Sequence, residues 1–315
     1  MCYPHRKERN SGMASQEAKA LKVKLGEILA RLSGDKDNRP SLEEMRAEGT
    51  VFGELASEPE GVTWTKVDAG GVPSIWADSA GGSTDRVVQY VHGGGYVIGS
   101  AAAYSRFTGH LAKSVGCPVL SVDYRLAPEN PHPAAVEDST KAYRWLLQQG
   151  YDPSHIAISG DSAGGGLTLA TLLSLRDAGT PLPAAAVPIS PWVDMEGTGE
   201  TMATNAERDV LVRAPMLHAM ALMFLGGGSA KDPLASPLHA DYSGIPEMYI
   251  QVGGDEALLD DARRVTKRAQ KAGVDVTLEI FPEMQHVFQI AVGGVPESDD
   301  AVAKIGAYLR PRLGL

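Results

Sequence analysis

Residues 156–166 read Ile-Ala-Ile-Ser-Gly-Asp-Ser-Ala-Gly-Gly-Gly, a short apolar run followed at once by small residues. The run is typical of a buried strand, and residues 163–178 carry the apolar spacing of a helix. Ser162 would then lie on the sharp turn between them, where small neighbours avoid a clash and the amides at the helix start face a reacting carbonyl. The pattern Gly-x-Ser-x-Gly alone is a weak signal in a chain with 35 glycines. Its position between a strand and a helix predicts that Ser162 is a nucleophile.

Short apolar runs alternate with longer helical patterns through most of the chain, which is typical of strand–helix–strand units. We therefore expect an α/β fold with a mostly parallel central sheet and helices on both of its faces. The expected strands cover residues 62–67, 72–77, 87–91, 119–123, 155–159, 185–189, 248–252 and 274–281. The expected helices cover residues 104–115, 134–149, 163–178, 260–272 and 299–309.

Two segments do not fit this alternation and are expected to be additions to the core. Residues 14–32 carry one apolar stripe, as in a helix that packs by a single face. Residues 196–233 lie between two expected strands and hold a methionine-rich helix that starts near Pro215. Such a helix is either part of the core or a lid, because methionine packs adaptably around varied surfaces. The two segments could contact each other.

Composition and charge exclude several classes of protein. With 315 residues, 43% of them hydrophobic, the chain can bury one large core and a small accessory part. The net charge of −10 argues against nucleic acid or an anionic membrane as a partner, because like charges repel. Cys2 and Cys117 imply no disulfide framework. The N-terminus does not resemble a secretory signal, and the most apolar helical stretch, residues 219–225, is too short to cross a bilayer. We therefore expect a cytoplasmic protein without integral membrane association.

A second motif, His92-Gly93-Gly94-Gly95-Tyr96, directly follows the expected strand 87–91. Consecutive glycines allow backbone N–H groups to turn toward a negatively charged oxygen without interference from a Cβ atom. We expect the amides of Gly93 and Gly94, together with that of Ala163, to form an oxyanion hole. The alternatives are a flexible loop or a phosphate-binding turn, but the sequence contains no pattern typical of a nucleotide-binding loop.

The general base is identified by elimination. In an enzyme with a nucleophile elbow the catalytic residues follow the chain order serine, acid, histidine. Three histidines follow Ser162: His218 lies on the methionine-rich helix and His239 lies in a turn near prolines. His286 lies in a loop between the last expected strand and the last expected helix, so we predict that His286 is the base.

The acid has several candidates. Asp255 follows the expected strand 248–252 through a Gly-Gly turn, which places it at the same edge of the sheet as Ser162, and we predict that it is the catalytic acid. Asp260 and Asp261 lie where the next helix begins, so capping that helix is the more natural role for them. Asp194, which follows the expected strand 185–189, is a further candidate whose alternative role is a structural turn.

Several separated motifs together resemble the bacterial hormone-sensitive-lipase family of carboxylesterases, in the α/β-hydrolase superfamily. They are residues 92–96, residues 121–129 (Ser-Val-Asp-Tyr-Arg-Leu-Ala-Pro-Glu), residues 160–165, Ser190-Pro191-Trp192 and His286-Val287-Phe288. The resemblance implies an α/β-hydrolase core, a helical cap, and hydrolysis of carboxylic esters with short to medium acyl chains. It also implies a triad of Ser162, Asp255 and His286, with Gly93, Gly94 and Ala163 donating backbone amides.

The resemblance implies a division of the chain and has two departures. We expect an N-terminal cap segment (residues 1–50), a catalytic core (residues 51–195 and 234–315) and a cap insertion (residues 196–233). The family usually has proline after the acid and glycine after the catalytic histidine, where this chain has Glu256 and Val287. A β-branched residue at 287 could change the loop and the acyl pocket.

Three other functions use much of the same framework. A lactone hydrolase uses the same triad and differs in the shape of its pocket. A ligand-binding protein similar to plant gibberellin receptors lacks the catalytic histidine, so His286 argues against it. Acyl transfer to an alcohol depends on how the cap controls water. We expect a small ester as substrate, no cofactor and no metal, since no cluster of ligands has usable spacing; a homodimer is suggested by the resemblance alone.

Overall fold

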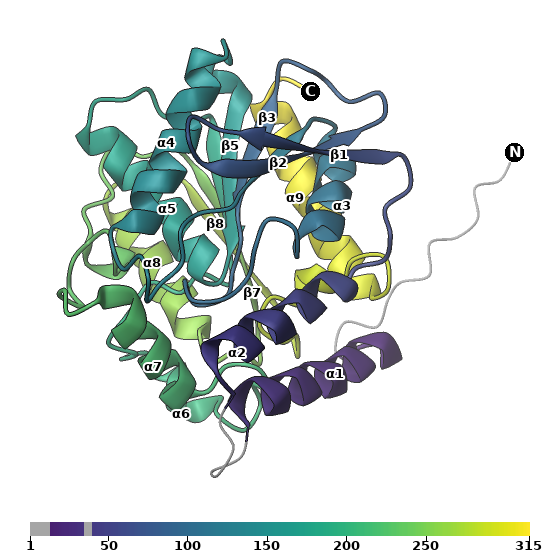
Figure 1. Cartoon of the computed structure of the whole chain (residues 1–315), viewed down its shortest axis with the longest axis vertical. Helices are drawn as coiled ribbons and strands as arrows, with labels where there is room; N and C mark the ends of the chain where they lie inside the picture. Colours follow the sequence, from purple (N-terminus) through teal and green to yellow (C-terminus); the bar gives the residue numbers. More distant parts are fainter. Residues whose placement is uncertain (1–12, 35–39) are drawn as a thin grey trace, which may run out of the picture.

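An eight-stranded sheet forms the centre of the protein (Figure 1). The computed structural model describes residues 13–34 and 40–315, so the expectations about Cys2 and about a secretory signal in residues 1–12 lie outside the described residues. The strand order is β1-β2-β4-β3-β5-β6-β7-β8; β2 pairs antiparallel with β1 and β4, and every other pair is parallel. The strands are β1 (Val62–Asp68), β2 (Pro73–Ser79), β3 (Val87–Val91), β4 (Val119–Val122), β5 (Ile156–Asp161), β6 (Ala185–Ile189), β7 (Met248–Gly253) and β8 (Val276–Phe281).

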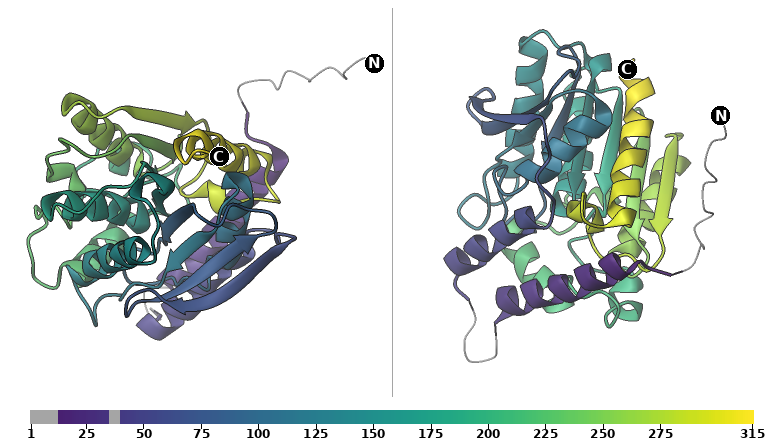
Figure 2. Two further views of the ribbon diagram at one scale, coloured as in Figure 1. Left: turned by 90° about the horizontal axis from the view of Figure 1, so that it is seen from above. Right: turned by 90° about the vertical axis from the view of Figure 1, so that its right-hand side faces the viewer.

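Helices cover both faces of the sheet (Figures 1 and 2). On one face α3 (Ser105–Val115) packs against α9 (Pro296–Arg312). On the other face lie α4 (Ala134–Gln148), α5 (Ala163–Asp177) and α8 (Leu259–Lys271). All the strands and helices that the alternating pattern predicts are present, with bounds that differ by a few residues. The α/β fold expected from the sequence is therefore confirmed.

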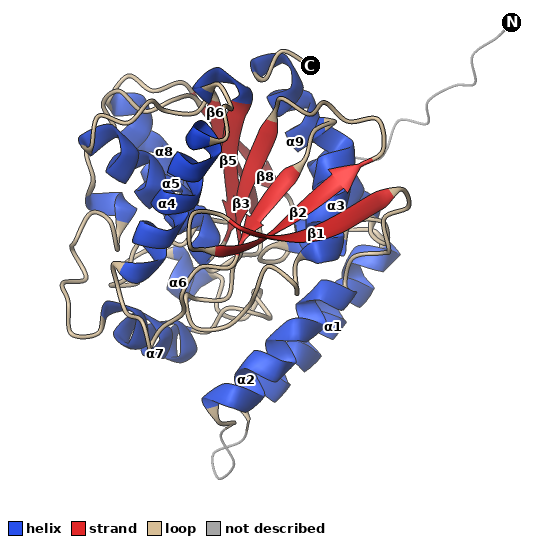
Figure 3. Cartoon of the chain, turned by 45° about the horizontal axis from the view of Figure 1, so that its top comes forward, coloured by secondary structure: helices blue, strands red, loops and turns tan. Residues whose placement is uncertain are grey.

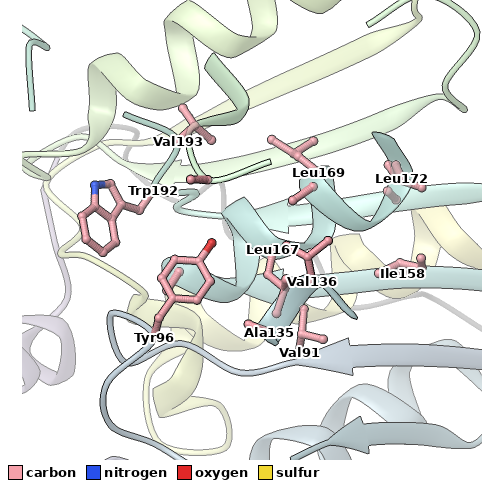
Figure 4. Packing of buried hydrophobic residues seen from close by; sticks show 14 of the residues in the cluster. Val91, Tyr96, Ala135, Val136, Ile158, Leu167, Leu169, Leu172, Trp192 and Val193 are labelled. Atoms are coloured by element: carbon pink, nitrogen blue, oxygen red, sulfur yellow. The ribbon is translucent and has the colours of Figure 1, made fainter. Parts of the chain in front are cut away.

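The inner strands are buried because helices cover them on both sides. Every residue of β3, β4, β5, β6 and β7 is buried, which explains why these strands are continuous apolar runs rather than alternating ones. The core between the sheet and the helices α4 and α5 extends to the carboxyl ends of the strands, where Tyr96 and Trp192 lie (Figure 4). Labelled members of this cluster are Val91, Tyr96, Ala135, Val136, Ile158, Leu167, Leu169, Leu172, Trp192 and Val193.

Four further helices lie together at one end of the molecule (Figures 1 and 3). They are α1 (Gln16–Ser33), α2 (Leu42–Gly49), α6 (Thr201–Thr204) and α7 (Ala214–Leu225), and we call them the cap helices. The short helix α2, which is polar over most of its length, was not expected from the sequence. The remaining turns are the 3-10 helices η1 (Thr50–Glu54), η2 (Pro153–His155), η3 (Pro237–His239) and η4 (Phe288–Ala291). In the described part of the chain, every helix is too short or too polar to span a lipid bilayer.

The N-terminal helix and the segment before α7 are in contact. The apolar stripe of α1, which includes Leu21 and Leu25, belongs to the same buried cluster as Leu211. The start of α1 is fixed to the C-terminal part of the chain, because the Ser15 hydroxyl and amide donate to the Glu297 carboxylate at 2.7 and 2.8 Å. Lys22 forms an ion pair with Asp255 at 3.1 Å. Apolar packing and polar contacts therefore both hold α1 on the core.

The turn between β5 and α5 depends on close backbone packing. Ser162 has φ 54° and ψ −118°, a conformation that is uncommon for residues other than glycine. A Cβ atom on Gly164 would lie 2.0 Å from the carbonyl oxygen of Val91 and 2.6 Å from that of His92. Only glycine at 164 therefore lets α5 start this close to the loop after β3.

The substitution Gly164→Ala should lower the free energy of unfolding by about 1–3 kcal/mol or more, because the new methyl group meets backbone atoms that cannot move independently. Gly26→Ala is the matched control, since its Cβ would lie 3.8 Å from the nearest atom, on Val210. It should stabilise α1 by roughly 0.5–1 kcal/mol. Thermal and urea unfolding of both variants would measure this, and equal stability of the two would contradict the packing argument.

Candidate active site

Ser162 and His286 come together at the carboxyl edge of the sheet. Ser162 follows β5, and His286 lies in the loop between β8 and η4. The His286 Nε2 atom is 2.8 Å from the Ser162 Oγ atom, and the Nδ1 atom is 2.8 Å from the Oε2 atom of Glu256. Both His286 and Glu256 are buried, with 4% and 0% of their surfaces exposed. The three side chains form the serine–histidine–carboxylate arrangement of an activated nucleophile.

The carboxylate in this arrangement belongs to Glu256, and the expectation that Asp255 is the acid is corrected. Asp255 is turned away from His286: its Oδ2 atom accepts from Lys22 at 3.1 Å and from the Gln285 side chain at 3.4 Å. Its backbone N–H donates to the carbonyl of Met284, which fixes this orientation. Successive side chains in the turn after β7 point in different directions, and the longer side chain of Glu256 points toward the imidazole.

The Glu256 carboxylate is held on its other oxygen as well. Its Oε1 atom accepts from the Ser190 hydroxyl at 2.6 Å and from the Gly253 amide at 2.5 Å. Burial raises the pKa of Glu256, and the interactions with His286, Ser190 and Gly253 oppose that rise. This contact explains the role of Ser190 in the Ser190-Pro191-Trp192 motif, because Ser190 orients the carboxylate that contacts His286.

The charges around His286 favour its protonated form. Burial lowers the pKa of the His286 imidazole, but the carboxylate of Glu256, with smaller contributions from Asp209 and Asp161, raises it by more. The net effect is a raised pKa. A base in this setting accepts a proton more readily than free imidazole does, which suits it to remove the proton of Ser162.

Val287 occupies the position where the resembled family usually has glycine, and the structure shows the local cost. Val287 has φ 54° in the left-handed region, which a β-branched residue rarely adopts. Its amide donates to the Ser190 hydroxyl at 3.3 Å, and its side chain faces the pocket beside Ser162. The loop after His286 therefore keeps the backbone conformation suited to glycine and adds an apolar side chain to the pocket wall.

The oxyanion hole differs from the expected one at one position. The amide of Gly93 donates to the Asp161 Oδ1 atom at 2.9 Å, so it is not free to bind an oxyanion. Within residues 13–34 and 40–315, the amides of Gly94, Gly95 and Ala163 donate to no protein group. The candidate oxyanion donors are therefore Gly94, Gly95 and Ala163, and the assignment of Gly93 is corrected.

The buried Asp161 carboxylate holds the glycine loop (residues 92–96) in place. Besides the Gly93 amide, its carboxylate accepts from the Tyr90 hydroxyl at 2.5 Å and the Tyr104 hydroxyl at 2.9 Å. Burial raises the pKa of Asp161, and these hydrogen bonds oppose that rise. Because Asp161 precedes Ser162 in the chain, one buried carboxylate connects the nucleophile turn to the loop that offers the oxyanion donors.

The remaining sequence candidates lie away from Ser162. His218 is on α7, and His239 in η3 lies near Glu196. Asp194 binds Arg264 at 2.8 Å. Asp261 and Asp260 do not cap α8 as expected. They accept backbone amides from the segment after β6, those of Val193 and Asp194 on Asp261 and that of Glu200 on Asp260.

A mostly apolar pocket, partly open to solvent, lies over the Ser162 hydroxyl. It is lined by Ser162 and His286, by the loops after β3 and β8, and by residues of the cap helices. The two cap segments contribute Leu25, Leu32, Leu211, Val212, Met216, Leu217 and Met220, and η1 contributes Phe52. The methionine-rich helix α7 is therefore packed against the core and also lines the pocket. Its role as a lid stays a prediction.

The comparison with known proteins assigns the family. A family model described as alpha/beta hydrolase fold, Abhydrolase_3, matches residues 88–290. The chain has a TM-score of 0.91 and 45% identity to the crystal structure of an esterase from the bacterial hormone-sensitive lipase family, covering 96% of this chain and 100% of that one. The chain belongs to this family. The resemblance first indicated by the sequence motifs is thus confirmed.

Members from several bacteria are similar over most of the length of this esterase. An acetyl-hydrolase of Streptomyces hygroscopicus is 44% identical over 264 residues, which is 84% of this chain and 87% of that protein. The carboxylesterase NlhH of Mycobacterium tuberculosis is 30% identical over 295 residues, 90% of this chain and 88% of that protein. The enzyme is thus a carboxylic ester hydrolase.

One group of side chains outside the pocket has potential metal ligands. Asp194, Glu196 and His239 have ligand atoms within 4.8 Å of one another. Asp194 already accepts from the Arg264 guanidinium and the Thr198 hydroxyl, so its charge is paired within the protein. We therefore assign no ion to this group, and the expected chemistry of the esterase uses none.

The substitution Glu256→Gln should lower kcat by roughly 10³- to 10⁴-fold, because an amide cannot stabilise the imidazolium and can favour the wrong tautomer of His286. Asp255→Asn should leave kcat within a few-fold, since Asp255 contacts Lys22 rather than the imidazole. Steady-state hydrolysis of a short p-nitrophenyl ester measures both. A larger loss in Asp255→Asn than in Glu256→Gln would restore Asp255 as the acid.

The pH dependence of the esterase should reflect the raised pKa of His286. The neutral imidazole is the active base, so kcat/KM should fall as the pH drops through this pKa. Because the surrounding carboxylates raise the pKa, the midpoint of the acidic limb should lie above the value of about 6.5 for free histidine. A kcat/KM profile with a non-ionising ester checks this, and a midpoint at or below the ordinary value would contradict the described charges.

Proposed function

We propose that this esterase hydrolyses carboxylic esters of short to medium acyl chains through an acyl-enzyme on Ser162. The observation that carries the proposal is the continuous chain of hydrogen bonds from Ser162 through His286 to Glu256, beside three backbone amides that donate to no group in the described part of the chain. In the proposed roles Ser162 is the nucleophile and His286 is the group that takes and returns protons. Glu256 is the carboxylate that orients His286 and stabilises its protonated form.

In the first half of the reaction the Ser162 Oγ atom attacks the ester carbonyl while His286 Nε2 takes the hydroxyl proton. The carbonyl oxygen becomes an oxyanion and accepts from the amides of Gly94, Gly95 and Ala163. Each such donor contributes about 2.7–4 kcal/mol in enzymes where it has been measured. Glu256 stabilises the imidazolium, which then gives its proton to the leaving alcohol.

In the second half a water molecule attacks the acyl-serine. His286 takes a proton from this water and returns it to the Ser162 oxygen as the carboxylic acid leaves. The amides that stabilised the first oxyanion stabilise the second one as well. The same groups therefore serve both halves, and no cofactor is needed for any step.

The pocket supports the proposed range of acyl chains. Its apolar lining, to which the cap side chains contribute, favours a hydrocarbon group. A long acyl chain would need cap side chains such as Met216 and Met220 to move. The division into a core and a cap drawn at residues 51, 196 and 234 is part of the same proposal.

The sequence-based expectations of a cytoplasmic location, of no nucleic-acid or integral membrane partner and of a homodimer stay predictions. The acidic charge of −10 supports the absence of a nucleic-acid partner, because the phosphate backbone would be repelled. Size-exclusion chromatography with light scattering gives the oligomeric state directly.

The proposal is tested with purified protein and p-nitrophenyl esters of increasing acyl length, together with a panel of lactones. We expect the highest kcat/KM with short to medium acyl chains and a loss of kcat in Ser162→Ala of roughly 10⁶-fold. A folded Ser162→Ala variant that kept its turnover would overturn the role of Ser162. Higher kcat/KM for lactones than for every acyclic ester would favour the lactone hydrolase instead.

A further inference from the structure

The loops that carry Glu256 and His286 are both bound by one short stretch that follows α6, residues 205–212. The Asn205 amide group donates to the backbone carbonyl of Glu256 at 2.8 Å and to that of Gly254 at 3.3 Å. Gln285, the residue before His286, accepts from the Val210 amide at 2.9 Å and donates to the Arg208 carbonyl at 3.1 Å. This stretch therefore contacts the loop after β7 and the loop after β8 at the same time.

Asp209 lies at the centre of the 205–212 segment and is fully buried. Its Oδ1 atom accepts from the amides of Leu211 and Val212, each at 2.8 Å. Its Oδ2 atom accepts from the amide of Ala257 at 2.7 Å. Ala257 directly follows Glu256, and Leu211 and Val212 line the pocket. A single carboxylate thus connects the pocket wall to the peptide next to Glu256.

We propose that the 205–212 segment positions the catalytic loops, with Asp209 as its positioning residue, which holds the peptide after Glu256 and the adjacent pocket wall in one geometry. The inference rests on the proposed role of Glu256. A buried carboxylate that accepts three backbone N–H groups is costly to bury and is stabilised only when all three donors are in place. Displacement of the Glu256 loop would remove the Ala257 amide from the Asp209 carboxylate and leave a buried charge with one hydrogen bond fewer. This cost holds the loop in position.

Asp209 also acts on His286 through its charge. The charged groups that face His286 come from three elements: Glu256 from the loop after β7, Asp161 from the end of β5, and Asp209 from the 205–212 segment. Asp255 and Lys22, beside Gln285, form an ion pair with each other. Burial lowers the pKa of His286 and the three carboxylates raise it. Neutralising Asp209 should therefore lower that pKa and move the acidic limb of activity to lower pH.

The decisive variant is Asp209→Asn, which keeps the size of the side chain but removes its charge and turns one acceptor into a donor. We expect kcat to fall roughly 10- to 100-fold, the range that follows when a catalytic group is displaced by about 1 Å. The midpoint of the acidic limb of kcat/KM should move to lower pH. A role confined to stability would lower the melting temperature without moving this midpoint.

Asp194→Asn is the matched control. Asp194 is also buried, also accepts backbone amides of a neighbouring turn, those of Glu196 and Thr198, and makes no contact with the loops of Glu256 and His286 in the described structure. Its variant should melt at a lower temperature, with the acidic limb and kcat of the wild type. An equal shift of the acidic limb in Asp194→Asn and Asp209→Asn would overturn the assignment to Asp209.

Asn205→Ala separates positioning from charge and keeps the proposal testable if Asp209→Asn does not fold. It removes the hydrogen bond to the Glu256 carbonyl and leaves every charge in place, so kcat should fall while the acidic limb stays where it is. Wild-type kcat in folded Asn205→Ala and Asp209→Asn would sink the inference and leave the esterase proposal intact. A wild-type protein that hydrolysed no ester would instead refute the proposed function.

Discussion

The close approach of backbones at Ser162 is the constraint on which the rest of the site depends. The Ser162 amide donates to the carbonyl of Ile189 at the end of β6, and the Ser162 carbonyl accepts from the Trp192 amide, each at 2.9 Å. The turn is thus bonded to the neighbouring strand on one side, while Gly164 allows contact with the loop after β3 on the other. The nucleophile, the oxyanion loop and the Ser190 segment that holds Glu256 acquire fixed relative positions from this one turn. Side-chain chemistry at the site follows from backbone packing.

The sequence was most informative where few residues of one type could fill a given structural or catalytic role. Glycines around Ser162, the strand before it and the order of the later loops predicted the nucleophile turn, and the small number of histidines left His286 as the candidate base. The fold was predictable for a similar reason: buried parallel strands are continuous apolar runs, and the helices between them have a different period. The helix α2 was missed because eight mostly polar residues carry too weak a periodic signal.

The two errors at the site have a common physical origin. Asp255 and Glu256 are adjacent carboxylates after the same strand, and the choice between them depends on the direction that the Gly253 turn gives each side chain. The three consecutive glycines likewise offer equivalent amides until the buried Asp161 binds one of them. In both cases the residue types alone could not specify which side chain or which amide points toward the site. The proline that usually follows the acid in the resembled family did not separate the two, because it is absent after both Asp255 and Glu256.

The stacking of Phe224 on Tyr96, with ring centroids 3.8 Å apart, joins the pocket helix α7 to the residue that ends the glycine loop. Met220 of the same helix lies against Gly95, where a Cβ atom would come within 2.3 Å of its sulfur. For protein engineering this contact has a clear meaning. Substitutions in α7 that are selected to admit a new acyl group also change the support of the oxyanion donors. Selectivity and turnover are therefore traits that vary together in this helix, and libraries that aim to alter only one of them are better placed in α1.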